Sequence, residues 1–318
     1  MRRRCFRLGA NVAAGRLLLR ITIAALAALS LGTFPSCASA KPSKTNCSAG
    51  HGAFRGTFQG TSVQIKPDVD PDDFNEPVCR LEVLGPAKQR IVSEIDHGFS
   101  MVASNLDVND DGIPDLVIEA YSGGAHCCWT YYIIQLGPNA RLLHKIENDR
   151  PAFFYESKKT RRVYLDTLDG AFDYFDGLCH ACTIFPQVTL RFEGDGIVDV
   201  SPRYASAYDQ VIAENERALS ATDRRSLRLL TPIQEDDAEK AASLTVTSRE
   251  PKRAAKALAI VLAYLYSGRE SKARQALEKL WPQFDRARIW DLILETRRNG
   301  ILCYIRGDSV CGENGGEA

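Results

Sequence analysis

Short apolar segments bounded by Gly, Pro or Asp recur along the first half of the chain, from about residue 50 to residue 200. They are rich in Val, Ile, Tyr and Phe, which are the residue types that β-strands favour. The segments lie at 51–65, 80–85, 115–121, 129–137, 161–167 and 187–192. Because no long run with helical periodicity separates them, the sequence predicts a β-rich region built of antiparallel sheets.

Helical periodicity replaces this pattern after about residue 203. The strongest pattern begins at Pro251, a residue type that suits the first position of a helix, and continues with small and apolar residues on one face. Ser267-Gly268 is expected to interrupt this helix, and Asn299-Gly300 is expected to end the last one. Helices are predicted at 206–221, 222–230, 235–244, 251–281 with the interruption, and 285–298.

The strand pattern of the first half and the helical periodicity of the second predict an α+β protein. Its β-rich domain is expected at 41–202, followed by an all-α domain at 203–318. In the second domain, the hairpin at about 256–281 resembles a tetratricopeptide unit, with small and apolar positions matched by Tyr264, Gly268, Ala273, Leu277 and Leu280. Such repeats need about three neighbours to bury a core, and one clear unit is recognisable. Two interpretations stay open: a helical bundle that closes on the β-rich half, and a helical array that binds a protein partner.

The N-terminal 40 residues have the pattern of a secretory signal peptide. Six arginines and no acidic residue occupy positions 1–20, an apolar segment follows at 21–31, and Ala38-Ser39-Ala40 forms a cleavage site of the A-x-A type. The apolar segment is shorter than the roughly 20 residues that cross a bilayer, so no transmembrane segment is expected. The protein is therefore predicted to be exported, to the periplasm or outside the cell, and Arg3-Arg4 leaves twin-arginine export open as the route.

Removal of this segment changes the charge of the chain. The remaining residues hold 34 Lys and Arg against 40 Asp and Glu, a net charge of −6. This balance argues against nucleic acid as the main partner, because binding phosphates requires a positive surface. It is compatible with a cation as ligand.

An acidic loop at residues 107–115, Asp-Val-Asn-Asp-Asp-Gly-Ile-Pro-Asp, has the spacing of a calcium site. Calcium takes six to eight oxygen ligands, and such a loop can present them from alternate positions. The Gly at position 112 permits a sharp turn, because it has no Cβ to clash at positive φ. The predicted ligands are the side chains of Asp107, Asn109, Asp111 and Asp115 and the backbone carbonyl of Ile113.

This loop resembles the FG-GAP type of calcium loop, D-x-N-x-D-G-x-x-D-L, which lies in a turn between two strands. The resemblance implies a structural calcium ion at the five ligand positions and implies nothing catalytic. It departs from an EF-hand, since Ile118 stands where a bidentate Glu is expected and the apolar residues before it resemble a strand. It also departs from a full propeller, which needs about four or more blades, since one good motif is present.

Eight cysteines remain after the signal segment: Cys47, Cys79, Cys127, Cys128, Cys179, Cys182, Cys303 and Cys311. In an exported chain, an even number first predicts disulfides. Cys127 and Cys128 are expected to pair with Cys179 and Cys182, and the other four to pair as Cys47–Cys79 and Cys303–Cys311. Two alternatives stay open for the cluster at 126–128 and 179–182. One is a zinc or copper site that includes His126 and His180, and the other is thiol redox chemistry at Cys179-His180-Ala181-Cys182.

No motif of a known catalytic site was found: the sequence lacks a G-x-S-x-G elbow, an H-E-x-x-H pair and a phosphate-binding loop. The sequence therefore predicts an exported, non-enzymatic binding protein with a structural calcium ion and a disulfide-stabilised β-domain. The helical domain is the expected surface for a protein partner. The alternatives are an exported hydrolase of cell-envelope material with calcium near its site, and a Cys/His metal or thiol-redox protein.

Overall fold

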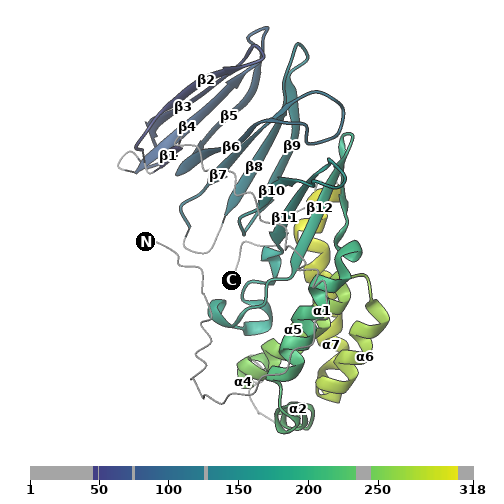
Figure 1. Cartoon of the computed structure of the whole chain (residues 1–318). Helices are drawn as coiled ribbons and strands as arrows, with labels where there is room; N and C mark the ends of the chain where they lie inside the picture. Colours follow the sequence, from purple (N-terminus) through teal and green to yellow (C-terminus); the bar gives the residue numbers. More distant parts are fainter. Residues whose placement is uncertain (1–45, 49, 74–75, 125–127, 234–244, 307–318) are drawn as a thin grey trace, which may run out of the picture. The chain divides into compact units, whose positions relative to one another are not determined.

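The computed structural model describes residues 46–48, 50–73, 76–124, 128–233 and 245–306, except the side chains of Asn46, Tyr304 and Arg306. In this part of the chain, antiparallel strands fill residues 46–199 and helices predominate from residue 201 onward (Figure 1). The α+β fold class predicted from the sequence is confirmed. The predicted signal peptide at 1–40 and the predicted helix at 235–244 lie outside the described residues.

The strands of the described residues form three antiparallel sheets. The N-terminal sheet has the order β2-β3-β4-β5, the central sheet β1-β6-β7-β8-β9, and the C-terminal sheet β10-β11-β12-β13. The bounds of the first two sheets are β1 Asn46–Ser48, β2 Phe54–Phe58, β3 Thr61–Val69, β4 Pro77–Leu84, β5 Arg90–Asp96, β6 Gly98–Leu106, β7 Asp115–Tyr121, β8 Trp129–Gln135 and β9 Arg141–Asn148. Those of the third are β10 Phe153–Glu156, β11 Val163–Leu168, β12 Gln187–Glu193 and β13 Gly196–Asp199.

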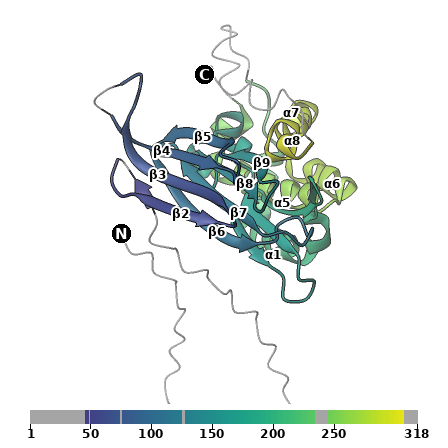
Figure 2. The same ribbon diagram turned by 90° about the horizontal axis from the view of Figure 1, so that it is seen from above.

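The central sheet is covered on both faces. On one face, Leu116 and Ile118 of β7 join a buried cluster that includes Val63 and Leu81 of the N-terminal sheet. On the other face, Val117 joins a larger cluster shared with the C-terminal sheet and the helices. Seen from above, the helices lie on the far side of the central sheet from β3 and β4 (Figure 2). Burial on both faces explains why β7 is a continuous apolar run rather than an alternating one.

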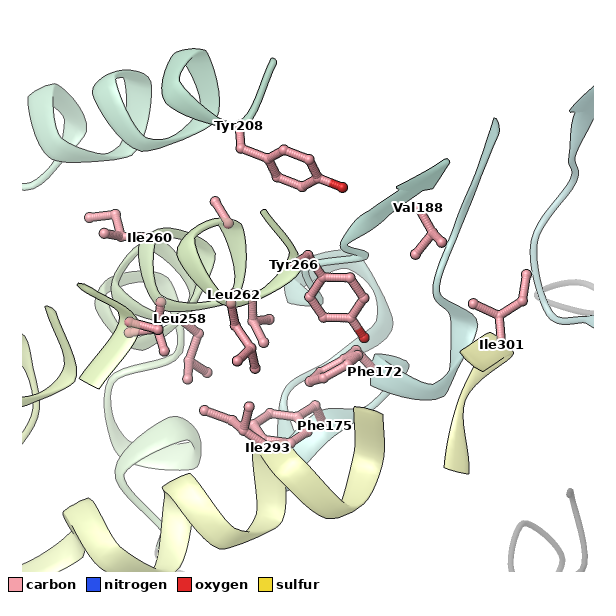
Figure 3. Packing of buried hydrophobic residues seen from close by; sticks show 14 of the residues in the cluster. Phe172, Phe175, Val188, Tyr208, Leu258, Ile260, Leu262, Tyr266, Ile293 and Ile301 are labelled. Atoms are coloured by element: carbon pink, nitrogen blue, oxygen red, sulfur yellow. The ribbon is translucent and has the colours of Figure 1, made fainter. Parts of the chain in front are cut away.

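The helices pack around α5, which spans Pro251–Tyr266. Ten of its sixteen residues are buried, on every side of the helix, as expected for a helix in the middle of a core. Tyr208 of α1, Ile293 of α7 and Phe172 of the C-terminal β-region contribute to the same cluster (Figure 3). The other helices are α1 Ala205–Ala218, α2 Ala221–Arg228, α4 Val246–Arg249, α6 Glu270–Leu280, α7 Arg286–Asn299 and α8 Ile301–Arg306.

Short 3-10 turns connect these elements, and three of them follow β11. They are η1 Gly170–Phe172, η2 Phe175–Gly177 and η3 His180–Cys182, with η4 Ser201–Tyr204 before α1 and η5 Gln283–Asp285 before α7. Phe172 and Phe175, from η1 and η2, point into the cluster that surrounds α5 (Figure 3). The buried core is therefore continuous across residue 202, and the assignment of two separate domains stays a prediction.

One predicted strand is two strands in the structure. The segment 51–65 contains β2 and β3, which pair through a two-residue turn at Gln59 and Gly60. Both turn residues have positive φ, 47° and 85°, as the tight hairpin turns that match strand twist require. No helix among the described residues is both long enough and apolar enough for a membrane crossing.

Candidate functional site: the acidic loop and the cysteines

The acidic loop at 107–114 connects β6 to β7 in the central sheet. Its first and last residues are brought together because Leu106 of β6 pairs with Asp115 of β7. Between them the chain reverses tightly, with φ of 64° at Asp110 and 82° at Gly112. The expectation that Gly112 supports a sharp turn is confirmed, and an added Cβ there would strain the backbone whatever the space around it.

Two acidic side chains hold this turn by accepting hydrogen bonds from backbone N–H groups. The carboxylate of Asp107 accepts from Asp111 at 3.1 Å and from Gly112 at 2.9 Å. The Oδ1 atom of Asp111 accepts from the N–H of Ile113 at 2.7 Å. These local bonds are typical of Asp in turns, and they orient both carboxylates toward the inside of the loop.

Two further predicted ligands are buried and have an oxygen without a protein partner. Asp115 is 0% exposed and Asn109 is 4% exposed. One carboxylate oxygen of Asp115 accepts from the N–H of Val108 at 2.7 Å, but its Oδ1 atom and the Oδ1 atom of Asn109 have no hydrogen-bond partner. A buried oxygen without a partner costs about 1–3 kcal/mol, so both atoms favour an additional group in the loop.

The electrostatics of Asp115 also favour a cation beside its carboxylate. Burial is the main cause that raises the pKa of this carboxyl from 3.8 to about 7. The hydrogen bond from Val108 opposes the rise, while the nearby carboxylates of Asp111 and Asp107 add to it. A cation among these groups would offset both the burial and the repulsion.

Gln135 of β8 is a polar residue of this loop that sequence reasoning missed. Its Nε2 donates to Oδ2 of Asp111 at 2.5 Å, and Asn109 donates to the same oxygen at 3.1 Å. Gln135 lies opposite Asp115 in the β7–β8 pairing, so the strand register brings it to the loop. No local spacing in the sequence could have shown this contact, because it depends on the register of another strand.

The loop combines several kinds of oxygen donor. In the part of the chain that the structure describes, no group of three or more His, Cys, Asp or Glu side chains is gathered as a metal site. The predicted set instead contains three carboxylates, the amide of Asn109 and the backbone carbonyl of Ile113. Calcium accepts such mixed oxygen donors. The two partnerless buried oxygens are the observation by which these residues fit a calcium ion.

One predicted disulfide is present in the structure, and another pair of cysteines is bonded differently from the prediction. Cys47 of β1 is bonded to Cys79 of β4, as predicted, and links the central sheet to the N-terminal sheet. Cys179 and Cys182 are bonded to each other, with their Cα atoms 5.0 Å apart. The expectation that they pair with Cys127 and Cys128 is therefore wrong, because the turn η3 already places the two sulfurs within bonding reach.

The remaining cysteines are described only in part. The Sγ atom of Cys128 donates to Oδ1 of Asp149 at 3.3 Å, at the start of β8. Cys303 is disulfide-bonded, but its predicted partner Cys311 lies outside the described residues. His126 and Cys127 also lie outside them. While Cys179 and Cys182 are bonded to each other, neither can serve as a thiolate ligand for zinc or copper.

No family model, curated protein or solved structure matches this chain. The resemblances of the acidic loop and of the helical hairpin to known families therefore stay predictions.

Proposed function

We propose that this protein is a calcium-stabilised, exported binding protein whose β6–β7 loop holds a structural calcium ion. The observation that carries the proposal is the pair of buried, partnerless oxygens, Oδ1 of Asn109 and Oδ1 of Asp115. Both atoms belong to residues that the spacing of the loop assigns as ligands. Together with the carboxylates of Asp107 and Asp111, they form a set of oxygen ligands for calcium. Water alone would satisfy this set poorly.

The ion would stabilise the central sheet at the point where β7 begins. Asp115 is the first residue of β7 and Gln135 is the last of β8, and the two are cross-strand partners. A calcium ion bound by Asp107 and Asp115 would therefore tie the end of β6 to the start of β7 and would relieve the repulsion between their carboxylates. This role is structural and requires no reacting substrate.

The proposed location and binding role agree with two further features. The disulfides Cys47–Cys79 and Cys179–Cys182 are typical of an oxidising compartment. Calcium is abundant outside cells, where sites with dissociation constants of about 10⁻⁴–10⁻³ M are filled. Because α5 supplies the core, the polar outer faces of α2, α6 and α7 are exposed and are the proposed surface for a protein partner.

Thermal unfolding of residues 41–318 with calcium or with a chelator tests the calcium site. We expect calcium to raise Tm, since a ligand at about 100 times its dissociation constant stabilises the folded state by about 2.7 kcal/mol. Asp115→Asn should abolish this rise, because it removes a buried ligand charge. Magnesium is a smaller ion that requires octahedral coordination, so it should raise Tm less than calcium does.

A matched control is available in the acidic residues that follow β3. Asp72 is exposed, and Asp72→Asn should leave the calcium response unchanged. An unchanged Tm of the wild type at millimolar calcium would refute the proposal. A calcium response that survives in both Asp107→Asn and Asp115→Asn would place the ion elsewhere and would also refute it.

A further inference from the structure

The two disulfides that the structure describes in full have opposite environments. Cys47 and Cys79 are 1% and 0% exposed, and their bond closes a long stretch of chain, with a sequence separation of 32. Cys179 is exposed and Cys182 is half-buried, and their separation is only three. Exchange with a thiol requires the attacking sulfur to reach the disulfide. The Cys179–Cys182 bond is open to such attack in the folded protein, whereas the Cys47–Cys79 bond is not.

Hydrogen bonds hold the turn around Cys179 and Cys182 independently of the sulfur link. The N–H of Cys182 donates to the carbonyl of Cys179 at 2.7 Å, and the N–H of Thr183 donates to the carbonyl of His180 at 3.3 Å. The hydroxyl of Thr183 donates to the carbonyl of Cys179 at 3.1 Å and accepts from the N–H of Tyr174 at 3.2 Å. The turn therefore keeps its shape when the bond between the sulfurs is opened.

Charged and aromatic side chains surround His180, one of the two residues between the cysteines. The Nδ1 atom of His180 lies 2.8 Å from both carboxylate oxygens of Asp173. The guanidinium of Arg150 lies 3.1 Å from Asp173, 3.4 Å from the same Nδ1 atom, and 3.5 Å from the ring centre of Phe185. Arg150 is only 14% exposed in its side chain, so its charge acts with little screening by water. These contacts fix His180 between the two cysteines of the turn.

We propose that Cys179–Cys182 is a redox-active disulfide that exchanges with external dithiols or with glutathione. The thiolate of the reductant attacks Sγ of Cys179, a mixed disulfide forms there, and the electron pair of the broken S–S bond passes to Sγ of Cys182. A second thiolate then attacks the reductant's own sulfur and releases Cys179 as a thiolate. Protons from the reductant and from water give two protein thiols, so the reductant is oxidised to a disulfide and the protein pair is reduced.

The direction of attack follows from burial. Cys179 faces solvent, and Cys182 packs against the large core cluster. The incoming thiolate therefore reaches Cys179, and the sheltered Cys182 is the leaving sulfur. This proposal is independent of the calcium site, which lies in another loop and another sheet.

Differential alkylation with peptide mapping tests the proposal on the folded chain of residues 41–318. After incubation with dithiothreitol, we expect alkylation at Cys179 and Cys182 at least about 100-fold faster than at Cys47 and Cys79, because the buried pair reacts only through opening of the fold. The far-UV circular dichroism spectrum should stay unchanged during this reduction. Equal rates for the two pairs, or reduction that occurs only as the protein unfolds, would overturn the proposal.

A trapping experiment identifies the attacked sulfur. In Cys182→Ser, the remaining Cys179 thiol should form a stable mixed disulfide with oxidised glutathione, detected by the mass of its peptide. Cys128→Ser is the matched control, since it changes a cysteine outside the turn and should leave the reduction rate of Cys179–Cys182 unchanged. A Cys182→Ser protein that takes up no glutathione at Cys179 would overturn the proposal.

Discussion

Asp169 connects the end of the C-terminal sheet to two helices through a fully buried carboxylate. Its side chain accepts hydrogen bonds from the hydroxyl of Tyr266 at 2.6 Å, the N–H of Ala171 at 3.2 Å and the N–H of Ile301 at 3.3 Å. Burial nevertheless raises the pKa of this carboxyl from 3.8 to about 6, and the three hydrogen bonds and the charge of Arg297 oppose that rise. Ionisation of Asp169 therefore lowers the stability of the folded protein.

The cost of ionisation at Asp169 predicts how stability varies with pH. Between about pH 4 and pH 6 the folded state binds the proton while the unfolded state has lost it, so stability falls as pH rises. A difference between 3.8 and about 6 corresponds to about 3 kcal/mol of unfolding free energy, at 1.36 kcal/mol per pKa unit. This contribution is fully present below pH 3.8 and is lost above about pH 6.

Urea denaturation of the wild type and of Asp169→Asn between pH 4 and pH 7 measures this contribution. The amide cannot ionise, so the stability of the variant relative to the wild type should rise by about 2 kcal/mol between pH 4 and pH 7, most of the full difference. Asp291→Asn, at an exposed position of α7, controls for the loss of one carboxyl group. A difference between wild type and Asp169→Asn that is constant with pH, or that falls with pH, would refute the reasoning.

Two other substitutions test the packing around buried polar groups. Gly300→Ala should destabilise the protein by about 1–3 kcal/mol, because its Cβ would lie 2.4 Å from a carboxylate oxygen of Asp169. Gly196→Ala, whose Cβ would meet one backbone oxygen at 3.4 Å, should cost far less in the same urea titration, and equal costs would contradict this explanation. Tyr131→Phe should lower the free energy of unfolding by about 1–3 kcal/mol. The substitution leaves the half-buried Glu119 carboxylate and the backbone N–H of Ala152 without their hydrogen-bond partner. A change below about 0.5 kcal/mol in thermal unfolding would count against this explanation.

Most of the longer helices were predictable because their signals are local, whereas the short helices α4 and α8 were missed. Pro251 is the first residue of α5, and the interruption at Ser267-Gly268 coincides with its end, where Gly268 has a φ of 75°. Asn299 is the last residue of α7. Pro251 and Gly268 act through their own backbone preferences. Little about the rest of the fold is needed to recognise such residues.

Several strands were missed because their patterns are irregular. The register of β6 against β7 shifts twice, between Met101 and Leu106, so its apolar residues do not alternate regularly. The strand β9 lies at the edge of the central sheet and is only partly buried, so it carries charged residues among apolar ones. Period-two alternation, the usual signal of a half-buried strand, is weak in both cases.

In the candidate sites, too, local features were predictable from the sequence and long-range contacts were not. The pattern of the acidic loop predicted a sharp turn at Gly112, since that information lies within nine residues. The contact of Gln135 with Asp111 and that of Tyr266 with Asp169 depend on sheet register and helix packing. The latter pair is separated by 97 residues. Contacts of this kind follow from the fold and have no local signature.

The Cys47–Cys79 bond also determines how the protein would bear mechanical force. The strand β1 has only three residues and pairs with β6 at the edge of the central sheet. A pull on the chain ahead of Cys47 would peel such a strand away one hydrogen bond at a time. The disulfide instead passes the load to Cys79 in β4, which pairs along its length with β3 and β5. Force from the N-terminal side is thus transmitted to the paired strands of the N-terminal sheet, and reduction of this bond would leave β1 as the first element to detach.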